Sequence, residues 1–371
     1  MAARTPSLNQ RFAMTIRVLS ILLATLGCTA QAQLLTVANF GGANGKAQDV
    51  AFIKPFSRAR GQEVIGIEYT GDLAPIRAMV RDRKVTWDVV EVESTDLKVG
   101  CDEGLFERID RAAVPHASLL LPGTVKECGV GAFVWSTVMA YDATRFKEAP
   151  RTWADFWNVH RFPGKRGLRK GARYNLEIAL MSDGVKRLDV YAMLATQVGL
   201  ERAIARLEQL KPHIVWWESG AQPPQRLASG EVSMSTAFNG RIAAANRDGA
   251  TQLTIVWTDT IHELDYWVIV KGSPKAAMAQ AFINFATSEE TQLAFSREIP
   301  YGPTHFNAIF RYDVGRSRPT SGLNNYLVDL SMATSELPSA PGNLRRSLAF
   351  DAGFWTQHGG AIEKRFSQRM Q

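Results

Sequence analysis

Short β-type runs alternate with amphipathic helical stretches along most of this chain. Leu34 to Phe40 and Val64 to Tyr69 are predicted strands, and the stretches that follow them, Lys46 to Arg60 and Leu73 to Arg83, have helical periodicity. Such alternation predicts an α/β fold with parallel sheets. In these sheets ligands bind beyond the carboxyl ends of the strands, so the loops there are the places to look for a site.

The same alternation continues through the second half of the chain. Gly199 separates two predicted helices, Arg187 to Val198 and Leu200 to Leu210. No stretch has the composition of a flexible linker, so we expect the chain to pass between its domains along extended strands. Further strands are predicted at Trp87–Val92, Phe133–Tyr141, His213–Trp217, Val232–Phe238, Leu253–Trp257 and Tyr266–Val270.

The first 32 residues have the layout of a cleavable signal peptide. Ile16 to Cys28 is an apolar stretch too short to span a bilayer, and small residues follow it up to a cleavage site after Ala32. A buried N-terminal helix is the alternative. Cys28 could instead carry a lipid, but Thr25 stands where such a site prefers Leu, so we expect soluble export. Met14 could replace Met1 as the start.

The charge balance gives little support for nucleic-acid binding. The formal net charge is +7, but the predicted signal peptide contains three arginines and no acid, so the charge of the rest is +4. The remaining Lys and Arg residues are dispersed among acids instead of forming a basic stripe.

Two cysteines remain after export. Cys101 and Cys128 are an even pair in a compartment where disulfides persist, so we predict a bond between them. Two separate buried thiols are the alternative.

The sequence lacks the motifs of an enzyme or a metal site. The six His residues are scattered without metal-binding spacing, and neither a CxxC pair nor a GxSxG motif is present. An iron site would require two adjacent Tyr residues, and Tyr301 has no adjacent Tyr. We therefore expect no catalysis, no metal and no cofactor, and a secreted hydrolase remains a remote alternative.

A series of fragments, in this order and spacing, resembles the polyamine-type (spermidine/putrescine) periplasmic solute-binding proteins of ABC importers. The resemblance covers about residues 35–366. Its fragments are NFGG (39–42), WDVVEVE (87–93), EGLFERID (103–110), VMAYD (138–142), TWADFWN (152–158), FPGKRGLR (162–169), LKPHIVWW (210–217), SGEV (229–232), FNGR (238–241), LDYWVIVKG (264–272), IPYGPTHFNA (299–308) and FWTQ (354–357).

The resemblance implies a type II binding-protein fold, in which crossing strands join two α/β lobes around a ligand cleft. We expect residues 33–137 and 268–312 in lobe 1, residues 138–267 in lobe 2, and residues 313–371 packed across both. It also implies a periplasmic monomer that delivers a small amine to the transmembrane subunits of an ABC permease.

The resemblance also implies positions for the ligand site. Phe40 and Phe238 match aromatic walls of the family, and Asp265 matches the acid that holds an amine. A capping role at the surface is the alternative for Asp265. In the strand His213–Trp217 alternate residues face opposite ways, so only one of Trp216 and Trp217 can face the cleft, and we assign Trp217 to the site. Packing in the core is the alternative for this Trp pair.

Three family features are absent here. Thr95 and Asp96 replace a Tyr in the loop after the third strand, residues 171–174 (GARY) replace an acidic pair, and Glu263 replaces an aromatic residue. We expect Glu93 and Asp96, with Glu91 as a further candidate, to supply the missing carboxylates. Solvation of these acids in exposed loops is the alternative.

Arg241 suggests a different ligand. A guanidinium after Phe238-Asn239-Gly240 could bind a carboxylate with two hydrogen bonds, or it could form a salt bridge between domains. Together with Asp265 it would suit a zwitterion. We therefore place a putrescine- or spermidine-like polyamine first and an ω-amino acid such as γ-aminobutyrate second.

Overall fold

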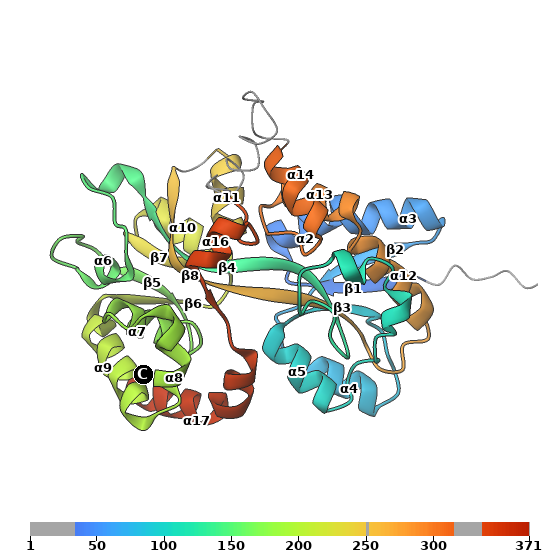
Figure 1. The fold of residues 1–371 in the computed structure, drawn as a ribbon, viewed down its shortest axis with the longest axis horizontal. Coiled ribbons are helices and arrows are strands. Elements are labelled where there is room, and N and C mark those ends of the chain that lie inside the picture. Colours follow the sequence, from blue (N-terminus) through green and yellow to red (C-terminus); the bar gives the residue numbers. More distant parts are fainter. Residues whose placement is uncertain (1–33, 250–251, 315–335, 371) are drawn as a thin grey trace, which may run out of the picture. The chain divides into compact units, whose positions relative to one another are not determined.

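One mixed sheet organises the fold. The computed structural model describes residues 34–249, 252–314 and 336–370, and within them nine strands form a sheet in the order β2-β1-β3-β8-β4-β7-β5-β6, with β9 beside β8 (Figure 1). The strands are β1 (Leu35–Asn39), β2 (Val64–Glu68), β3 (Val89–Glu93), β4 (Val130–Asp142), β5 (Arg166–Arg169), β6 (Ile214–Trp217), β7 (Met234–Phe238), β8 (Leu253–Ile269) and β9 (Leu348–Ala349). The predicted signal peptide, with Cys28 and the alternative start Met14, lies outside the described residues.

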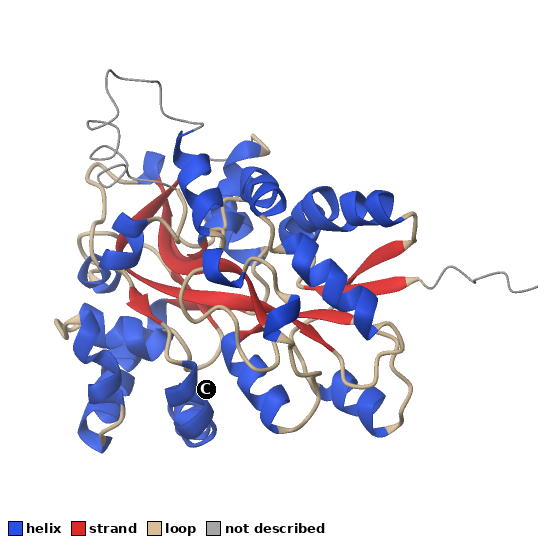
Figure 2. Cartoon of the chain, turned by 45° about the vertical axis from the view of Figure 1, so that its right-hand side comes forward, coloured by secondary structure: helices blue, strands red, loops and turns tan. Residues whose placement is uncertain are grey.

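Helices pack on the sheet, as Figure 2 shows. They are α2 (Gly42–Gln48), the π-helical turn η1 (Asp49–Ile53), α3 (Lys54–Arg60), α4 (Ala74–Arg81), α5 (Ser94–Asp102), α6 (Trp153–Trp157), α7 (Asn175–Ser182), α8 (Val190–Leu194), α9 (Gln197–Leu210), α10 (Gln222–Ser229), α11 (Asn239–Arg247), α12 (Ala276–Ala286), α13 (Glu289–Glu298), α14 (Phe306–Val314), α16 (Pro341–Arg346) and α17 (Ala352–Met370). In the described ranges none of them combines the length and the apolar character that a membrane crossing requires.

Alternate residues of the parallel strands are buried on opposite faces of the sheet. Val37 of β1 and Val89 of β3 belong to a core cluster that includes η1 and α12, whereas Ala38 and Val90 belong to a second cluster with α4. This two-sided burial explains why these strands read as continuous apolar runs. The predicted α/β class is confirmed.

Two long antiparallel strands, β4 and β8, join the two groups of parallel strands. β3 pairs with the C-terminal end of β8, and β7 pairs with residues 137–141 of β4. We call the side with β2, β1 and β3 the first lobe, and the side with β7, β5 and β6 the second lobe (Figure 1). The expected passage of the chain between domains along extended strands is confirmed, and the residue boundaries of the lobes remain a prediction.

The structure corrects the prediction of two strands at Leu253–Trp257 and Tyr266–Val270, because both lie in the single strand β8. Polar residues interrupt the apolar pattern in the middle of this strand. Two of them, Glu263 and Asp265, are nevertheless buried, with 3% and 4% exposure, and form hydrogen bonds there. Residues 257–260 bulge between the pairs that β8 makes with β4.

Two predicted helix boundaries were wrong. The helix expected from Lys46 begins at Gly42, and Pro55 adjoins the π-helical turn η1, since proline has no N–H to donate to the preceding turn. Gly199 does not separate two helices but lies inside α9. The break comes at Thr196, whose side chain accepts the Gly199 N–H at 3.0 Å and caps the helix.

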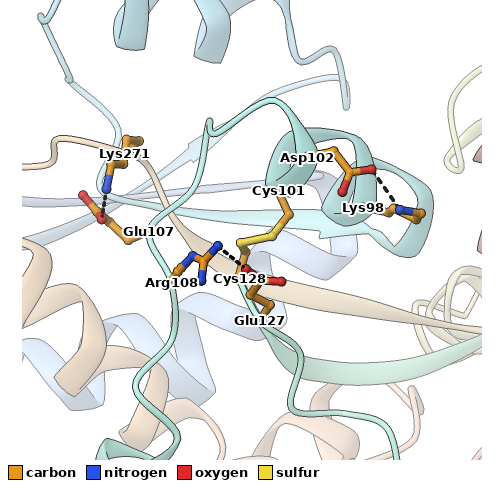
Figure 3. Close-up of a disulfide and its surroundings, with 8 residues drawn as sticks. All are labelled: Lys98, Cys101, Asp102, Glu107, Arg108, Glu127, Cys128 and Lys271. Carbon is orange, nitrogen blue, oxygen red and sulfur yellow. Dashed lines mark hydrogen bonds and ion pairs between the residues drawn. A yellow bond between two sulfur atoms is a disulfide. The ribbon is translucent and has the colours of Figure 1, made fainter.

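The predicted disulfide is present. Cys101, near the end of α5, is bonded to Cys128, which lies two residues before β4 (Figure 3). An ion pair between Arg108 and Glu127, at 2.8 Å, lies beside it. The bond therefore ties the loop between α5 and β4 to the first lobe.

The described part of the C-terminal segment contacts both lobes. Helix α17 packs against α5 of the first lobe and α9 of the second. Its Trp355 indole donates to Glu177 of α7 at 2.6 Å, and Arg369 forms an ion pair with Glu208 of α9 at 2.6 Å.

Candidate ligand-binding site

A cavity of about 350 Å³ lies where the two lobes meet. Residues from the ends of β1, β3, β5 and β7 and from the middle of β4 and β8 line it. These positions come from distant parts of the chain, and the crossing strands bring them together. The lining of the cavity combines carboxyl groups, guanidinium groups and aromatic rings.

Four acids share one face of the sheet. Glu91 and Glu93 are two residues apart in β3, as are Glu263 and Asp265 in β8, and Glu93 lies opposite Asp265 in the antiparallel pair. Side chains two residues apart in a strand point to the same face. On the next strand, β4, Phe133 lies opposite Asp265.

Glu91 is fully buried and is held by polar neighbours of the first lobe. Both of its carboxyl oxygens accept from the Asn44 amide, at 2.9 and 3.0 Å, and Oε2 also accepts from Gln48 at 2.7 Å and from the Phe40 N–H at 3.4 Å. Burial raises the pKa of Glu91, and these donors work against that rise by stabilising the charged form.

Asp265 lies next to Glu91 and is 4% exposed. The Trp135 indole donates to its Oδ1 at 2.8 Å, and a further hydrogen bond joins it to Glu91. Burial and then the charge of Glu91 raise the pKa of Asp265 well above its usual value. This shift favours the protonated form of Asp265.

Two further acids of the lining, Glu93 and Asp96, differ in their partners. Glu93 forms an ion pair with Arg169 of the second lobe at 3.0 Å. Asp96, in the first turn of α5, has a pKa raised to about 7 by burial and by the charge of Glu93. It can therefore change its charge near neutral pH.

Aromatic rings form walls of the cavity on both sides. Phe40 stacks on Tyr69 of the first lobe, with ring centroids 5.2 Å apart. Phe238 of the second lobe meets Trp135 edge to face at 4.8 Å. Such walls suit an apolar stem that carries a charged group.

Arg241 reaches from α11 across to the first lobe. It is 8% exposed, and its Nη2 donates to the carbonyl oxygens of Phe40 at 3.2 Å and Gly41 at 3.1 Å. Its Nε is buried and has no hydrogen-bond partner among the described residues. A Cβ on Gly42, where φ is +56°, would lie 2.5 Å from Nη1, so glycine at this position makes room for the guanidinium.

Arg169, at the end of β5, is a second guanidinium in the lining. It lies over the rings of Tyr174 and Phe238, 5.3 and 5.5 Å from their centroids. Its Nη1 is buried without a partner among the described residues. The sequence analysis missed Arg169, although its place at the carboxyl end of a parallel strand was a signal that could have identified it.

Six of the seven predicted ligand-binding residues line the cavity. They are Phe40, Glu93, Asp96, Phe238, Arg241 and Asp265. Trp217 does not. It is 1% exposed, lies edge-on behind Phe238 at 5.3 Å, and donates its indole N–H to Thr236 at 3.2 Å. Since Phe238 separates it from the cavity, we leave Trp217 out of the proposed site.

Glu263, which replaces a family aromatic, connects the two lobes just outside the cavity lining. It accepts from the Ser94 N–H at 3.0 Å and from the Tyr174 hydroxyl at 2.5 Å. Burial and the charge of Glu93 raise its pKa to about 8. Among the described residues, no group of three or more His, Cys, Asp or Glu side chains is placed to hold a metal ion.

Comparison with known proteins gives consistent matches. Residues 51–308 match the family model of bacterial extracellular solute-binding proteins. A γ-aminobutyric acid-binding protein of Pseudomonas aeruginosa is 52% identical over 339 residues, which is 91% of each chain.

The fold is also similar to that of solved structures of proteins that are named for, or bound to, small ligands. One is the PBP MotA of A. tumefaciens B6 in complex with glucopine, with a TM-score of 0.79 and 28% identity over 91% of this chain and all of that one. Another is the Atu4243 GABA receptor, with a TM-score of 0.76 and 28% identity over 91% of this chain and 98% of that one.

Proposed function

Since this chain belongs to the bacterial extracellular solute-binding proteins, we propose that it captures an ω-amino acid, with γ-aminobutyrate as the first candidate, and delivers it to an ABC importer. We place this step in the periplasm. The order of the two ligand classes is thus reversed. The polyamine that the sequence placed first has no support in the comparisons, whereas the 52% identical relative is a γ-aminobutyric acid-binding protein.

The observation that carries this proposal is the pair of incompletely bonded guanidinium groups in the lining. Arg241 Nε and Arg169 Nη1 are buried and lack a partner among the described residues. A buried N–H without an acceptor costs free energy, and a ligand carboxylate would supply the acceptor with a charge-assisted bond. A polyamine has no acceptor to offer, and its positive charges would be repelled by both arginines.

The carboxyl groups of Glu91 and Asp265 are suited to bind the ammonium group of the ligand. Glu91 and Asp265 lie together in the buried part of the lining, and neither forms an ion pair with a described Lys or Arg residue. We assign the ammonium group of the ligand to them. Phe40 and Phe238 would then enclose the methylene chain between the two charged ends.

Calorimetry of the exported chain, residues 33–371, with a matched set of ligands tests this proposal. γ-Aminobutyrate carries both charged groups, butyrate lacks the amine, and putrescine replaces the carboxylate with a second amine. We expect γ-aminobutyrate to bind at least about 30-fold more tightly than either, since each lost charged contact costs about 2 kcal/mol or more.

Tighter binding of putrescine or spermidine would return the polyamine to first place. The ligand recovered from the mixture should be chemically unchanged, because the proposal includes no reaction. Conversion of the ligand would instead favour an enzyme.

A further inference from the structure

We propose that the unliganded protein holds one proton between the Glu91 and Asp265 carboxyl groups, and that the ammonium group of the ligand replaces this proton on binding. The inference rests on the proposed function to the extent that it needs a ligand with an ammonium group. It predicts that ligand capture releases a proton to the solvent.

The backbone register places the two carboxyl groups together. Glu93 of β3 lies opposite Asp265 of β8, so Glu91, two residues earlier on the same face, is the diagonal neighbour of Asp265. Both side chains line the cavity, with 0% and 4% exposure. A hydrogen bond joins them, and two carboxyl groups can form such a bond only if one of them keeps its proton.

The neighbouring donors decide which of the two carries the proton. Glu91 accepts from Asn44, Gln48 and the Phe40 N–H, and all of these bonds favour its charged form. Among the described residues, Asp265 accepts only from Trp135 besides its bond with Glu91. The proton therefore lies on Asp265, in agreement with the raised pKa of that residue.

The neighbouring acids work in the same direction. Glu93 from β3 adds negative charge, which raises the pKa of Asp265 further, and Glu263 from β8 does so in its charged form. The pKa values of two phenols that face the pair, Tyr69 and Tyr301, are raised by burial, so both stay neutral near pH 7. The remaining groups in the lining are Asp96 from α5, Arg169 from β5, Arg173, Glu68, Glu218 and Arg241 from α11.

An ammonium group can replace the shared proton without leaving an unpaired carboxylate. Its three N–H donors can serve both carboxyl groups at once. Its positive charge also lowers the pKa of the neighbouring acid, so Asp265 loses its proton to the solvent. The O–H bond of Asp265 is broken, so that Asp265 becomes charged beside the already charged Glu91, and one proton leaves for each ligand that enters.

Calorimetry at pH 7 in phosphate and in Tris, at equal ionic strength, measures this proton directly. A released proton is taken up by the buffer, and Tris gives off more heat than phosphate when it takes up a proton. Binding of γ-aminobutyrate should therefore be more exothermic in Tris, and the enthalpy difference should correspond to about one proton per ligand. The dissociation constant should also fall by about tenfold per pH unit between pH 6 and pH 8. Equal enthalpies in the two buffers would overturn the inference.

The outcomes separate this inference from the proposed function. Binding of γ-aminobutyrate without proton release rejects the exchange and leaves the function standing. If putrescine binds and γ-aminobutyrate does not, the proposed function fails, and the same two buffers test the exchange with putrescine. If neither amine binds, both proposals are rejected.

Three variants identify the group that releases the proton. Asp265→Asn should weaken binding and reduce the release to near zero. Glu263→Gln removes a buried acid of the same strand outside the cavity lining, and Asp96→Asn removes the acid with a pKa near 7. Both should keep the release close to one proton, and its loss in either variant would reject the assignment to Asp265. If Asp265→Asn binds no ligand, the number of protons released by the wild type and by these two variants still tests the assignment to Asp265.

Discussion

Arg241 joins the two lobes and, in the proposed function, would also bind the carboxylate of the ligand. The sequence left open whether it binds a carboxylate or forms a salt bridge between domains, and the structure shows no ion pair to a described acid. Instead, Nη2 donates to two carbonyl oxygens of the first lobe, while Nε stays without a partner among the described residues. The planar guanidinium allows both, because its donors point in fixed and different directions.

Arg241→Lys should therefore weaken γ-aminobutyrate binding by about 30-fold or more, because lysine keeps the charge but cannot match the guanidinium geometry. Putrescine binding should not weaken. Calorimetry checks both. The control is Arg247→Lys, an exposed position of the same helix α11, which should leave the affinity unchanged. Equal affinity of the Arg241→Lys variant and the wild type for γ-aminobutyrate would reject a carboxylate contact.

Substitutions at Trp217 and Phe238 can be compared to distinguish a packing role from a ligand contact. Trp217→Phe removes the hydrogen bond to Thr236 and should lower the free energy of unfolding by about 1 kcal/mol without changing affinity. Phe238→Leu removes an aromatic wall and should weaken binding. Denaturant titration and calorimetry measure the two effects. A loss of affinity in Trp217→Phe as large as in Phe238→Leu would place Trp217 back in the site.

At the scale of elements, Glu177 fastens helix α17 to the second lobe. Its Oε1 accepts from Trp355 at 2.6 Å and from the Tyr191 hydroxyl at 3.2 Å, whereas Oε2 is buried without a partner among the described residues. Burial raises the pKa of Glu177 to about 7. The folded state therefore favours the protonated form more strongly than the unfolded state does.

This shift makes part of the stability dependent on pH. The contribution of Glu177 is complete below the unfolded pKa of about 4.3 and is lost as the pH rises through about 7. Gln stays neutral at all these pH values. When the pH is raised from 4.5 to 8, the free energy of unfolding of Glu177→Gln should therefore rise by about 3 kcal/mol relative to that of the wild type. Denaturant titrations at the two pH values measure the difference. An identical pH dependence in both proteins, or an equal gain in the half-buried control Glu208→Gln, would contradict this assignment.

The disulfide stabilises the segment between α5 and β4 (Figure 3). It closes a loop with a sequence separation of 27, for which the chain-entropy relation gives about 3.5 kcal/mol. The double variant Cys101→Ser/Cys128→Ser should lose stability of that order in denaturant titration. Since neither cysteine lines the candidate ligand cavity, the affinity of the double variant for γ-aminobutyrate should be retained. A variant as stable as the wild type would show that the bond adds no stability.

At the scale of the whole molecule, contacts across the cleft join the lobes. Arg169 pairs with Glu93, Arg241 reaches the carbonyls of Phe40 and Gly41, and Glu263 in the crossing strand β8 binds groups of both lobes. A ligand held by acids of the first lobe and arginines of the second would add to these contacts. We therefore expect ligand binding to stabilise the closed arrangement of the lobes.

γ-Aminobutyrate at about 100 times its dissociation constant should add about 2.7 kcal/mol to the free energy of unfolding, or roughly 5 °C to the melting temperature. A thermal scan with and without ligand measures this, and the shift should grow with ligand concentration. Butyrate at the same concentration is the control and should produce a much smaller shift. Light scattering on the same samples should show a monomer throughout.

We predicted the α/β class, the crossing strands and the disulfide from the sequence alone, and six residues of the cavity lining with the help of the family resemblance. The helices and strands follow from local patterns, since apolar periodicity sets each element, and strand ends collect the polar residues of a site. The resemblance to a family supplied Phe40, Phe238 and Asp265. The middle of β8 was missed because its buried acids replace the apolar residues by which a strand is recognised.

Which groups share the cavity, and in what state of charge, depends on the packing of the whole chain. Pairing of β3 with β8 brings Glu91 to Asp265, although they are 174 positions apart in the sequence, and packing places Arg169 beside Glu93 and Trp217 behind Phe238. The charge of a carboxyl group depends on its burial and on the donors around it, and both are properties of the folded chain. For this reason the sequence could identify a binding protein, while the choice between a polyamine and a zwitterion depended on the assembled cavity and on the relatives of the chain.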